Sequence, residues 1–508
     1  MAKVLLGIDV GTSGTKVSLF GINGDPVASH TDEYPLYQPQ NGWAEQDPAD
    51  WWRATVNGIR ATLAKAGSDA EVCGIGLSGQ MHGLVMLDRE ANVLRPSIIW
   101  CDQRTEAETE DMDRLLGRQR IIEITANAPM TGFTAAKIMW VKKNEPALYE
   151  KCAHILLPKD YIRYMLTGEY ATEVSDASGM QLMDVAKREW SSEVLGKLDI
   201  DGALLAKMHE SQDVTGVISP ECSALTGLAA GIPVVGGAGD NPAAAVGTGV
   251  VSQGKAFTTI GSSAVVYAVS DEVRIDLEGR VHALCASVPG KWTVMSCTQG
   301  AGLSLQWLRN NICTEEMHEA EKAGIDPYIL MDRLAEGVPA GSGRLLFLPY
   351  LMGERSPHPD PDCRGVFFGL SGVHSRANLI RAVLEGVAFS QLECVDVFKE
   401  MGVPVGDMMI TGGGAKSKIW RKMLADLYGC PVSVPTSNEG AVFGAAILAG
   451  VGAGEYANLQ EACGALIGKG DTILPDEEQG RAYAPYFKLY KQLYGSLKAD
   501  FKMLSRLT

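Results

Sequence analysis

The sequence lacks any CxxC pair, although eleven cysteines are scattered through its 508 residues. An odd number of cysteines without paired spacing argues against a disulfide framework. Cytosolic proteins keep their thiols reduced, and the pattern is typical of such proteins. We therefore expect a cytoplasmic protein with free thiols.

The sequence also lacks a long hydrophobic run. The longest stretch of small apolar residues, 441–454, is rich in glycine and falls short of the ~20 residues that span a bilayer. Near the N-terminus, Asp9 interrupts the apolar residues before the core of a signal peptide, about 7–15 residues, can form. We expect neither an export signal nor a membrane-spanning segment.

No block of lysine and arginine stands out. The chain carries 45 basic and 61 acidic residues, for a net charge of −16. This balance disfavours nucleic acid or an anionic membrane as a partner. Because the overall field repels phosphate, any bound phosphate has to be held locally by backbone N–H groups, hydroxyls and a metal ion.

The sequence does contain the alternation of an α/β protein. A chain of this length, at roughly 100–200 residues per domain, implies two or more domains. Alternating strand-like and helical runs predict mixed sheets covered by helices. The strand-like runs include residues 72–77, 85–87, 233–236 and 408–411, and the helical runs include 51–64, 379–397 and 419–428.

A hairpin with a tip of glycine and hydroxyl residues occurs twice. The first has strands at 4–8 and 17–20, and the second has strands at 256–260 and 264–269. The long interval between them indicates a duplicated domain rather than a short repeat. We predict one domain over 1–249 and a second over 250–508, with a cleft between them where the two tips face each other.

The first tip can bind phosphate. Its glycines let backbone N–H groups approach phosphate oxygens, and Thr12 and Ser13 add hydroxyl donors. Asp9, just before the tip, can hold Mg²⁺ through water. The tip is not a P-loop, because Thr15 stands between the last glycine and the lysine, and it opens a strand instead of the helix of a Rossmann motif. A plain hairpin turn is the alternative.

One carboxylate, Asp240, follows a glycine-rich bend at 236–239. An aspartate at such a bend can accept the proton of a substrate hydroxyl during phosphoryl transfer. The alternative is structural: the alanines at 243–245 predict a helix, and Asp240 or Asn241 would cap its N-terminus.

A possible sugar pocket is indicated by Gln80, Met81 and His82, which lie between two strand-like runs. Gln80 and His82 can hydrogen-bond sugar hydroxyls while Met81 packs on the apolar face of the ligand. The polar segment 99–104, which includes Asp102, also ends a strand-like run and can line the same pocket. A solvent-exposed hairpin histidine is the alternative.

Three successive glycines, 412–414, lie between a strand-like run and a helical run. A flat base or ribose can lie against such a backbone. The pair Lys416–Ser417 matches a P-loop poorly, because Ala415 occupies the position of the last glycine. A tight strand-to-helix turn is the alternative.

Two longer motifs resemble those of the FGGY carbohydrate kinases, a family within the superfamily of actin, hexokinase and the heat-shock chaperones. The resemblance covers residues 4–450 and implies an α/β fold of two ribonuclease-H-like (actin-like ATPase) domains, with ATP and sugar in the cleft between them. The motifs are Gly132-x-Thr134-x-x-Lys137-Ile138-x-Trp140-Val141-x-Lys143-Asn144 and Gly365-x-Phe367-x-Gly369-Leu370, the latter continuing through Asn378-Leu379 to Ala382-Val383-Leu384-Glu385.

The resemblance also implies individual roles. Asp240 would be the catalytic base, Asn241 a sugar ligand, and Asp9 together with Asp240 the carboxylates at Mg²⁺. Many relatives carry an asparagine shortly after the glycines of the adenosine side, and this chain departs from them there. The implied nucleotide-binding residues are Gly11, Thr12, Ser13, Gly14, Lys16, Gly261, Ser262, Gly302, Gln306, Gly413, Gly414 and Ser417.

The substrate is suggested by the pair Met81–His82. Glycerol kinases of the family carry Arg-Glu at this place, whereas kinases of xylulose carry Met-His. The resemblance thus implies transfer from MgATP to a ketopentose, with D-xylulose expected and ribulose, a hexulose, gluconate or a sugar alcohol left open. A free-standing actin-like ATPase and a sugar-binding regulator are alternatives from other classes. A homodimer is also left open.

Overall fold

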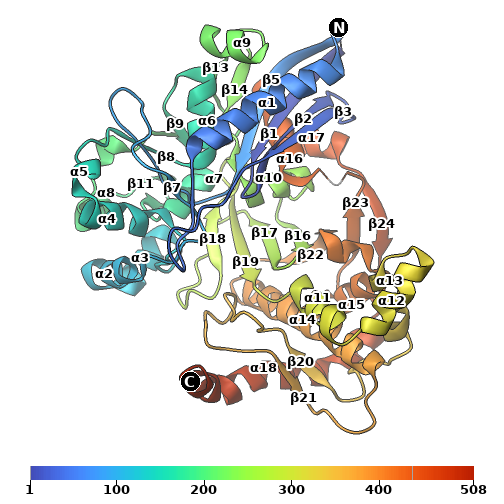
Figure 1. The fold of residues 1–508 in the computed structure, drawn as a ribbon. Helices are drawn as coiled ribbons and strands as arrows, with labels where there is room; N and C mark the ends of the chain where they lie inside the picture. Colours follow the sequence, from blue (N-terminus) through green and yellow to red (C-terminus); the bar gives the residue numbers. More distant parts are fainter. Residues whose placement is uncertain (1, 438, 508) are drawn as a thin grey trace.

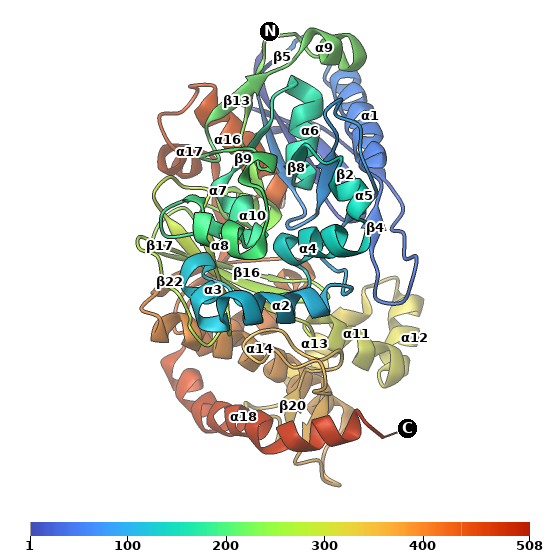
Figure 2. The same cartoon turned by 90° about the vertical axis from the view of Figure 1, so that its left-hand side faces the viewer.

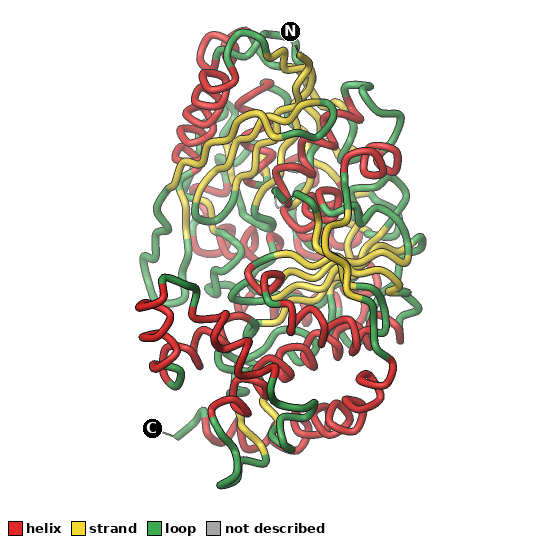
Figure 3. Tube along the Cα trace, turned by 90° about the vertical axis from the view of Figure 1, so that its right-hand side faces the viewer, coloured by secondary structure: helices red, strands yellow, loops and turns green. Residues whose placement is uncertain are grey.

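We describe a computed structural model of the chain over residues 2–437 and 439–507. Within these residues, the larger sheets have seven strands each, one sheet in each half of the sequence (Figure 1). Figure 3 shows the strands as two separate groups with helices around each. The predicted α/β class is confirmed.

The first sheet has the order β13-β14-β5-β1-β2-β3, with β15 beside β5. Strand β1 (Ala2–Val10) pairs in parallel with β5 (Ala70–Gly79) and antiparallel with β2 (Gly14–Gly21), so the predicted first hairpin is confirmed. The central strands are continuous apolar runs because both of their faces are covered. The other strands are β3 (Pro26–Glu33), β13 (Val214–Val217), β14 (Pro233–Val235) and β15 (Ala238–Gly239).

Helices cover both faces of this sheet (Figure 2). On one face lie α1 (Pro48–Ala66) and α6 (Pro158–Thr167), and on the other lies α16 (Gly440–Gly452) with α10 (Asp240–Gly247) packed on it. Asp47 begins α1 by accepting a hydrogen bond from the N–H of Ala49, as an N-cap residue does. The predicted helix at 51–64 is confirmed and extends by a few residues at each end.

Helix α16 belongs to the second half of the sequence but packs on the first sheet. The contact is so close that a Cβ at Gly76 would lie 1.9 Å from the carbonyl oxygen of Ala445. A Cβ at Gly444 would lie 1.8 Å from the carbonyl oxygen of Ala243 on α10. The two halves are therefore interlocked through α16, and the division at 249/250 stays a prediction.

The second sheet has the order β18-β19-β17-β16-β22-β23-β24. The predicted second hairpin is confirmed as β16 (Gly254–Ile260) and β17 (Ala264–Ser270). The long helix α14 (Arg376–Glu400) packs against this sheet, and α15 (Lys418–Tyr428) packs on α14. The other strands are β18 (His282–Cys285), β19 (Trp292–Thr298), β22 (Val405–Thr411), β23 (Val432–Pro435) and β24 (Lys469–Ile473).

The remaining elements cover the edges and ends of the sheets. Among the described residues, no helix combines the length and hydrophobicity that a membrane span requires. These elements are β4 (Glu45–Gln46), β6 (Val85–Leu87), β7 (Ser97–Ile98), α2 (Glu106–Leu116), α3 (Arg118–Thr125), α4 (Thr134–Asn144), α5 (Pro146–Tyr149), β8 (His154–Leu156), β9 (Ala171–Glu173), α7 (Val174–Ala177), η1 (Ser178–Met180), β10 (Met183–Asp184), β11 (Glu189–Trp190), α8 (Ser192–Leu198), η2 (Gly202–Leu204), β12 (Lys207–His209), α9 (Pro220–Thr226), α11 (Gly302–Asn311), α12 (Thr314–Ala323), α13 (Pro327–Glu336), β20 (Leu346–Leu348), β21 (Val366–Phe368), η3 (Gly413–Lys416), α17 (Leu459–Leu466) and α18 (Glu477–Leu504).

Candidate active site

Two carboxylates, Asp9 and Asp240, meet at one edge of the first sheet. Strands β1 and β15 both run parallel to β5, and Asp9 and Ala238 both pair with Ser78. Asp240 directly follows β15, so it lies at the same edge as Asp9. Burial, and then the charge of Asp9, raise the pKa of Asp240 to about 7.

The structure corrects the capping alternative for Asp240. The N-cap residue of α10 is Gly239, and Asp240 is the first residue of the helix. Its Oδ1 accepts hydrogen bonds from the backbone N–H of Asn241, at 2.7 Å, and from the Nδ2 of Asn241, at 2.9 Å. These bonds fix the orientation of the carboxylate at the start of the helix.

The pair of carboxylates fits a divalent cation. Within the described residues, the Oδ1 of Asp9 is buried and has no hydrogen-bond partner. Burial raises the pKa of Asp9, because the charged form has lost its water. Mg²⁺ is held in proteins by one or two carboxylates together with phosphate and water oxygens. Asp9 and Asp240 are thus the residues that would hold Mg²⁺.

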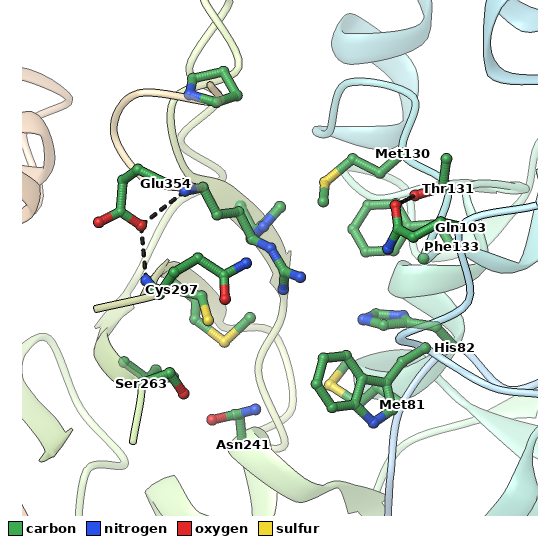
Figure 4. Close-up of a pocket in the computed structure, with 18 of the residues that line it drawn as sticks. Met81, His82, Gln103, Met130, Thr131, Phe133, Asn241, Ser263, Cys297 and Glu354 are labelled. Atoms are coloured by element: carbon green, nitrogen blue, oxygen red, sulfur yellow. Dashed lines mark hydrogen bonds between the residues drawn. The ribbon is translucent and has the colours of Figure 1, made fainter. Parts of the chain in front are cut away.

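A cavity of about 570 Å³ opens beside Asp240, and both halves of the chain line it. Figure 4 shows Met81, His82, Gln103, Met130, Thr131 and Phe133 on one side and Ser263, Cys297 and Glu354 on the other, with Asn241 between them. We call it the acceptor cavity. The remaining lining residues are Trp100, Gly132, Asp240, Val265, His282, Leu284, Met295, Gln299, Met352, Arg355, Pro359, Asp360 and Pro361.

His82 presents a hydrogen-bond acceptor to the acceptor cavity. Its Nδ1 lies 3.1 Å from the carbonyl oxygen of Gly179, and because a carbonyl can only accept, Nδ1 carries the proton. Burial, and then the charge of Lys137, lower the pKa of His82 well below its ordinary value, so the ring is neutral. A Cβ at Gly179 would lie 2.2 Å from the imidazole, which explains the glycine.

The first longer motif holds His82 in place. His82 has a positive φ of 69°, which is unusual for this residue type. Its carbonyl oxygen accepts hydrogen bonds from the Oγ1 of Thr134, at 3.1 Å, and the Nζ of Lys137, at 2.8 Å. Burial lowers the pKa of Lys137 to about 7. The sequence motif alone gives no role to Thr134 and Lys137. In the structure, both hold the backbone of His82 in place.

A second histidine, His282, lines the acceptor cavity and was missed by the sequence analysis. Its Nδ1 lies 3.0 Å from the Oδ1 of Asn127, whose Nδ2 donates to two backbone carbonyls. Nδ1 of His282 is therefore the donor. Burial lowers the pKa of His282 to about 4. No local signal marks this residue, because it stands in an ordinary strand, β18.

Gln80 and Asp102 do not line the acceptor cavity. Gln80 is buried and donates to the Oε1 of Gln46, at 2.7 Å, and to the carbonyl of Gly11, at 3.3 Å. Asp102 is buried and accepts hydrogen bonds from the guanidinium of Arg104 and from the N–H of Ala44. Gln80 therefore supports the first hairpin tip, and Asp102 supports segment 99–104.

Segment 99–104 does reach the acceptor cavity, through Trp100 and Gln103. The Nε1 of Trp100 also donates to the Oγ1 of Thr12, at 3.0 Å. Around the first tip, Ser13 is exposed, and the Nζ of Lys16 lies 2.5 Å from the Oε2 of Glu439. The first tip is thus tied to the wall of the cavity on one side and to the start of α16 on the other.

A second cavity, also of about 570 Å³, gathers most of the predicted nucleotide-binding residues. We call it the nucleotide cavity. The predicted residues in its lining are Gly261, Ser262, Gly302, Gln306, Gly413, Gly414 and Ser417, and the others are Ile260, Leu305, Asp326, Tyr328, Ile329, Asp332, Lys416 and Trp420. Gly11, Thr12, Ser13, Gly14 and Lys16 lie outside this lining.

Two glycines at the nucleotide cavity, Gly302 in its lining and Gly412 beside it, are required by close backbone approach. A Cβ at Gly302 would lie 2.3 Å from the carbonyl oxygen of Gly261, which accepts the N–H of Gly302 at 2.8 Å. A Cβ at Gly412, where φ is +79°, would lie 2.6 Å from the carbonyl oxygen of Ile260. Ser417 caps α15 by accepting the N–H of Trp420. The glycines 412–414 therefore form a tight turn, as the alternative interpretation expects. Two of them, Gly413 and Gly414, also line the nucleotide cavity.

The tip of the second hairpin joins the two cavities. Gly261 and Ser262 line the nucleotide cavity, and Ser263 lines the acceptor cavity. The carbonyl oxygens of Gly261 and Ser262 accept N–H groups at the start of α11, which fix the tip. The tip therefore borders both cavities.

The loop 352–361 forms the outer wall of the acceptor cavity and was also missed. Glu354 accepts the N–H groups of Gln299, at 2.7 Å, and Arg355, at 2.8 Å. Burial raises the pKa of Glu354 to about 8. Among the described residues, no carboxylate forms an ion pair with Arg355. A single arginine in a loop gives no pattern by which the sequence could indicate it.

The second longer motif supports α14 and the turn before β20. The Oδ1 of Asn378 accepts the N–H of Ser375 and completes a capping box. Glu385 accepts the N–H of Gly341, at 3.1 Å, and the Oγ of Ser342, at 2.8 Å. These residues contribute to the scaffold and lie outside both cavity linings.

Comparison with known proteins adds two family matches and close relatives. The model of the FGGY family of carbohydrate kinases, N-terminal domain, matches residues 4–247, and that of the C-terminal domain matches residues 256–453. The xylulose kinase of Escherichia coli (strain K12) is 38% identical over 493 residues, 97% of this chain and 99% of that protein. The gluconokinase of Bacillus subtilis (strain 168) is 31% identical over 507 residues, 99% of this chain and 98% of that protein.

A solved structure gives the same result. The crystal structure of xylulose kinase from Rhodospirillum rubrum has a TM-score of 0.92 at 30% identity, and the match covers 98% of this chain and 100% of that chain. The predicted fold of two ribonuclease-H-like, actin-like ATPase domains is thereby confirmed. Kinases of this family use ATP and phosphorylate an alcohol group. By sequence and by fold, the chain belongs to the FGGY family of carbohydrate kinases.

Proposed function

We propose that this carbohydrate kinase transfers the γ-phosphoryl group of ATP to the terminal hydroxyl of a ketopentose, with D-xylulose as its substrate and D-xylulose 5-phosphate as its product. The observation that carries the proposal is the second hairpin tip, 261–263, which lines both cavities. With ATP in the nucleotide cavity, its terminal phosphate would reach the tip, where the acceptor cavity and Asp240 begin.

Asp240 acts as the general base. Its carboxylate accepts the proton of the sugar hydroxyl while that oxygen forms a bond to the γ-phosphorus and the bond to the leaving ADP oxygen breaks. A pKa of about 7 leaves a substantial ionised fraction at neutral pH. Mg²⁺ bound by Asp9 and Asp240 would neutralise charge on the phosphate oxygens. The first tip, 11–14, with Lys16, and Gly261 with Ser262 are proposed as phosphate contacts.

The sugar is held by neutral hydrogen-bonding groups. His82 and His282 are neutral and have no hydrogen-bond partner at Nε2 among the described residues. They can accept hydrogen bonds from sugar hydroxyls, and Asn241 can both donate and accept. Met81 and Met295 offer apolar surface to the C–H groups. Such a lining suits an uncharged polyhydroxy chain.

The names of the relatives agree with this substrate. The Escherichia coli protein and the Rhodospirillum rubrum structure are xylulose kinases and match over nearly their whole length. The predicted pair Met81–His82 lies in the acceptor cavity, as a determinant of the substrate should. The expected partners are the sugar and MgATP, and a homodimer in the cytoplasm stays a prediction.

A second candidate substrate is gluconate or a similar aldonate. Arg355 lines the acceptor cavity without an ion-paired carboxylate among the described residues, and guanidinium groups recognise carboxylates well. The Bacillus subtilis gluconokinase is also a full-length relative. This candidate differs from the first by one negative charge on the substrate.

A substrate panel tests both candidates. ADP release is measured in a coupled assay with D-xylulose, D-ribulose, a ketohexose, gluconate, glycerol and xylitol, each over a range of concentrations. The largest kcat/KM is expected for D-xylulose. A larger kcat/KM for gluconate, lost in Arg355→Gln, would select the second candidate, and equal ADP release without any sugar would exclude a sugar kinase of either kind.

A further inference from the structure

A cluster of buried ionisable side chains lies behind the bend that carries Asp240. Nothing in the sequence indicates it, and it lines neither cavity. Burying so many charges is costly unless they are paired and hydrogen-bonded. The cluster, called the ion cluster below, consists of Lys159, Asp160 and Arg163 of α6, Glu173 of β9 and Asp176 of α7, all with no exposed surface.

The members of the ion cluster are closely paired. The Nζ of Lys159 lies 2.9 Å from Asp160, 3.2 Å from Glu173 and 3.2 Å from Asp176, and Arg163 lies 3.0 Å from Asp160. Two cations thus face three carboxyl groups. Burial raises the pKa of Asp176 to about 8, which makes it the protonated member at neutral pH.

The ion cluster reaches the start of the glycine-rich bend 236–239. The Nη1 of Arg163 donates to the carbonyl oxygen of Gly236 at 2.7 Å. A Cβ at Gly236 would lie 3.2 Å from the Cβ of Glu173. The bend therefore packs directly on the cluster, although the closest approach to a Cβ at Gly236, 2.9 Å, is by the carbonyl oxygen of Glu210, which lies outside the cluster.

The cluster also reaches the end of the bend, through Ser175. The Oγ of Ser175 donates a hydrogen bond to the Oε1 of Glu173 at 3.0 Å. The Oγ of Ser175 also accepts a hydrogen bond from the N–H of Gly239 at 3.3 Å. Gly239 is the residue directly before Asp240. Glu173 thus orients the hydroxyl of Ser175. The other hydrogen bond of this hydroxyl holds the N–H of Gly239, next to the Asp240 carboxylate.

We propose that Ser175, oriented by Glu173 and the ion cluster, is a positioning residue for the carboxylate of Asp240. A general base has to lie within hydrogen-bond reach of the proton that it removes, and a shift of about 1 Å can cost about 10²-fold in rate. The hydrogen bond from Gly239 to Ser175 fixes the position of Gly239 relative to the ion cluster, and with it the position of Asp240. The inference rests on the proposed role of Asp240 as the base.

A matched control is available in Ser211. Its hydroxyl is also fully buried and also donates to Glu173, at 2.7 Å to Oε2. The hydroxyl of Ser211 makes no hydrogen bond to the bend; only its backbone carbonyl does, by accepting the N–H of Gly237. The two serines therefore share the buried bond to Glu173 and differ in the side-chain bond to Gly239.

The test compares Ser175→Ala with Ser211→Ala in steady-state kinetics and in thermal unfolding. Both variants lose one buried hydrogen bond to Glu173, and Ser175→Ala also loses the bond to the N–H of Gly239, so both are expected to lower Tm, Ser175→Ala by somewhat more. For Ser175→Ala we expect kcat to fall about ten-fold with the KM for ATP unchanged, and for Ser211→Ala we expect kcat within about two-fold of the wild type. Ser175→Thr keeps the hydroxyl and is expected to restore most of kcat.

Equal kcat in the two alanine variants, or a change in KM for ATP alone, would overturn the inference. If Ser175→Ala cannot be obtained folded, Ser175→Cys makes the same comparison, because a thiol accepts hydrogen bonds weakly. Asp240→Asn is measured alongside. Full activity in Asp240→Asn would remove the proposed base itself, whereas an inactive Asp240→Asn with an unchanged Ser175→Ala would remove only the positioning role.

Discussion

The two cavities have the same volume but are built differently. Among the described residues, the lining of the nucleotide cavity comes from 260–420 in the second half, and it includes the glycines Gly261, Gly302, Gly413 and Gly414. The acceptor cavity is lined from both halves, and its polar side chains have strongly shifted pKa values. One cavity thus depends on local turns, and the other depends on how distant segments pack together.

This difference indicates where specificity resides. Turns bind ligands through their backbone N–H groups, and such groups suit phosphates, which are common to many substrates. A cavity of buried side chains whose protonation is set by burial distinguishes one polar ligand from another. Changes in the acceptor cavity are therefore expected to alter the chemistry and the sugar, and changes in the nucleotide cavity are expected to alter the use of ATP.

The largest effect is expected for Asp240→Asn. Removing the proposed general base should lower kcat by about 10³-fold or more, while the affinity for metal-free ATP, measured by calorimetry in the presence of EDTA, stays near that of the wild type. The reason is that Asp240 lines the acceptor cavity and not the nucleotide cavity. A variant that keeps a tenth of the wild-type turnover would contradict the role of Asp240.

A large effect on the other cavity is expected for Gly302→Ala. The new Cβ would lie 2.3 Å from the carbonyl oxygen of Gly261, so the hairpin tip has to shift. We expect a loss of about 1–3 kcal/mol in the free energy of unfolding and a clear rise in the KM for ATP. Gly464→Ala, where a Cβ meets no atom within 4 Å, is the control and should leave both quantities unchanged or slightly improved.

The reciprocal prediction concerns His82→Ala. Loss of its Nε2 acceptor should raise the KM for the sugar about ten-fold or more and leave the KM for ATP unchanged. Steady-state kinetics with each substrate varied in turn measures the two constants. If both KM values rise equally, the two cavities do not act separately, and the comparison fails.

The smallest effect concerns the stability of the acceptor cavity at acidic pH. Burial lowers the pKa of His282 to about 4 in the folded protein, whereas the pKa of a histidine in the unfolded chain is near 6.5. Between these values the unfolded chain binds more protons, so stability falls as the pH is lowered from 6.5 to 4, by about 1–3 kcal/mol from this residue.

Urea unfolding of His282→Gln at a series of pH values measures this contribution. The variant should lose part of the acid sensitivity of the wild type. His318→Gln, the same substitution at an exposed position, is the control. An identical pH dependence in His282→Gln and the wild type would show that His282 is not held neutral by burial.

Much of the fold could be predicted because its signals are local. The two hairpins, the strand-like runs at 72–77 and 408–411, and the helices around 51–64 and 379–397 appear in the structure with small changes in their bounds. Apolar runs and glycine turns specify such elements within a few residues. The packing of α16 on the first sheet could not be predicted in this way, because it joins residues more than 400 positions apart.

In the candidate site, too, some residues could be predicted from local signals in the sequence and others could not. Met81, His82, Asp240 and Asn241 stand beside glycines in the sequence, and they lie together in the acceptor cavity. Gln80 also stands beside a glycine, and Asp102 follows a strand-like run, but in the structure both side chains make internal hydrogen bonds. His282 and Arg355 belong to no motif that the sequence marks, and they could not be found.

By itself, the sequence determined the two hairpin tips, the bend before Asp240 and the glycines of the nucleotide cavity, because backbone conformation depends on neighbouring residues. Only the tertiary structure decided which polar side chains enter the acceptor cavity, which histidines are neutral, and that a buried ion cluster packs against the glycine-rich bend before Asp240. These properties depend on burial and on charges brought together from distant segments, and neither is encoded in a short stretch of chain.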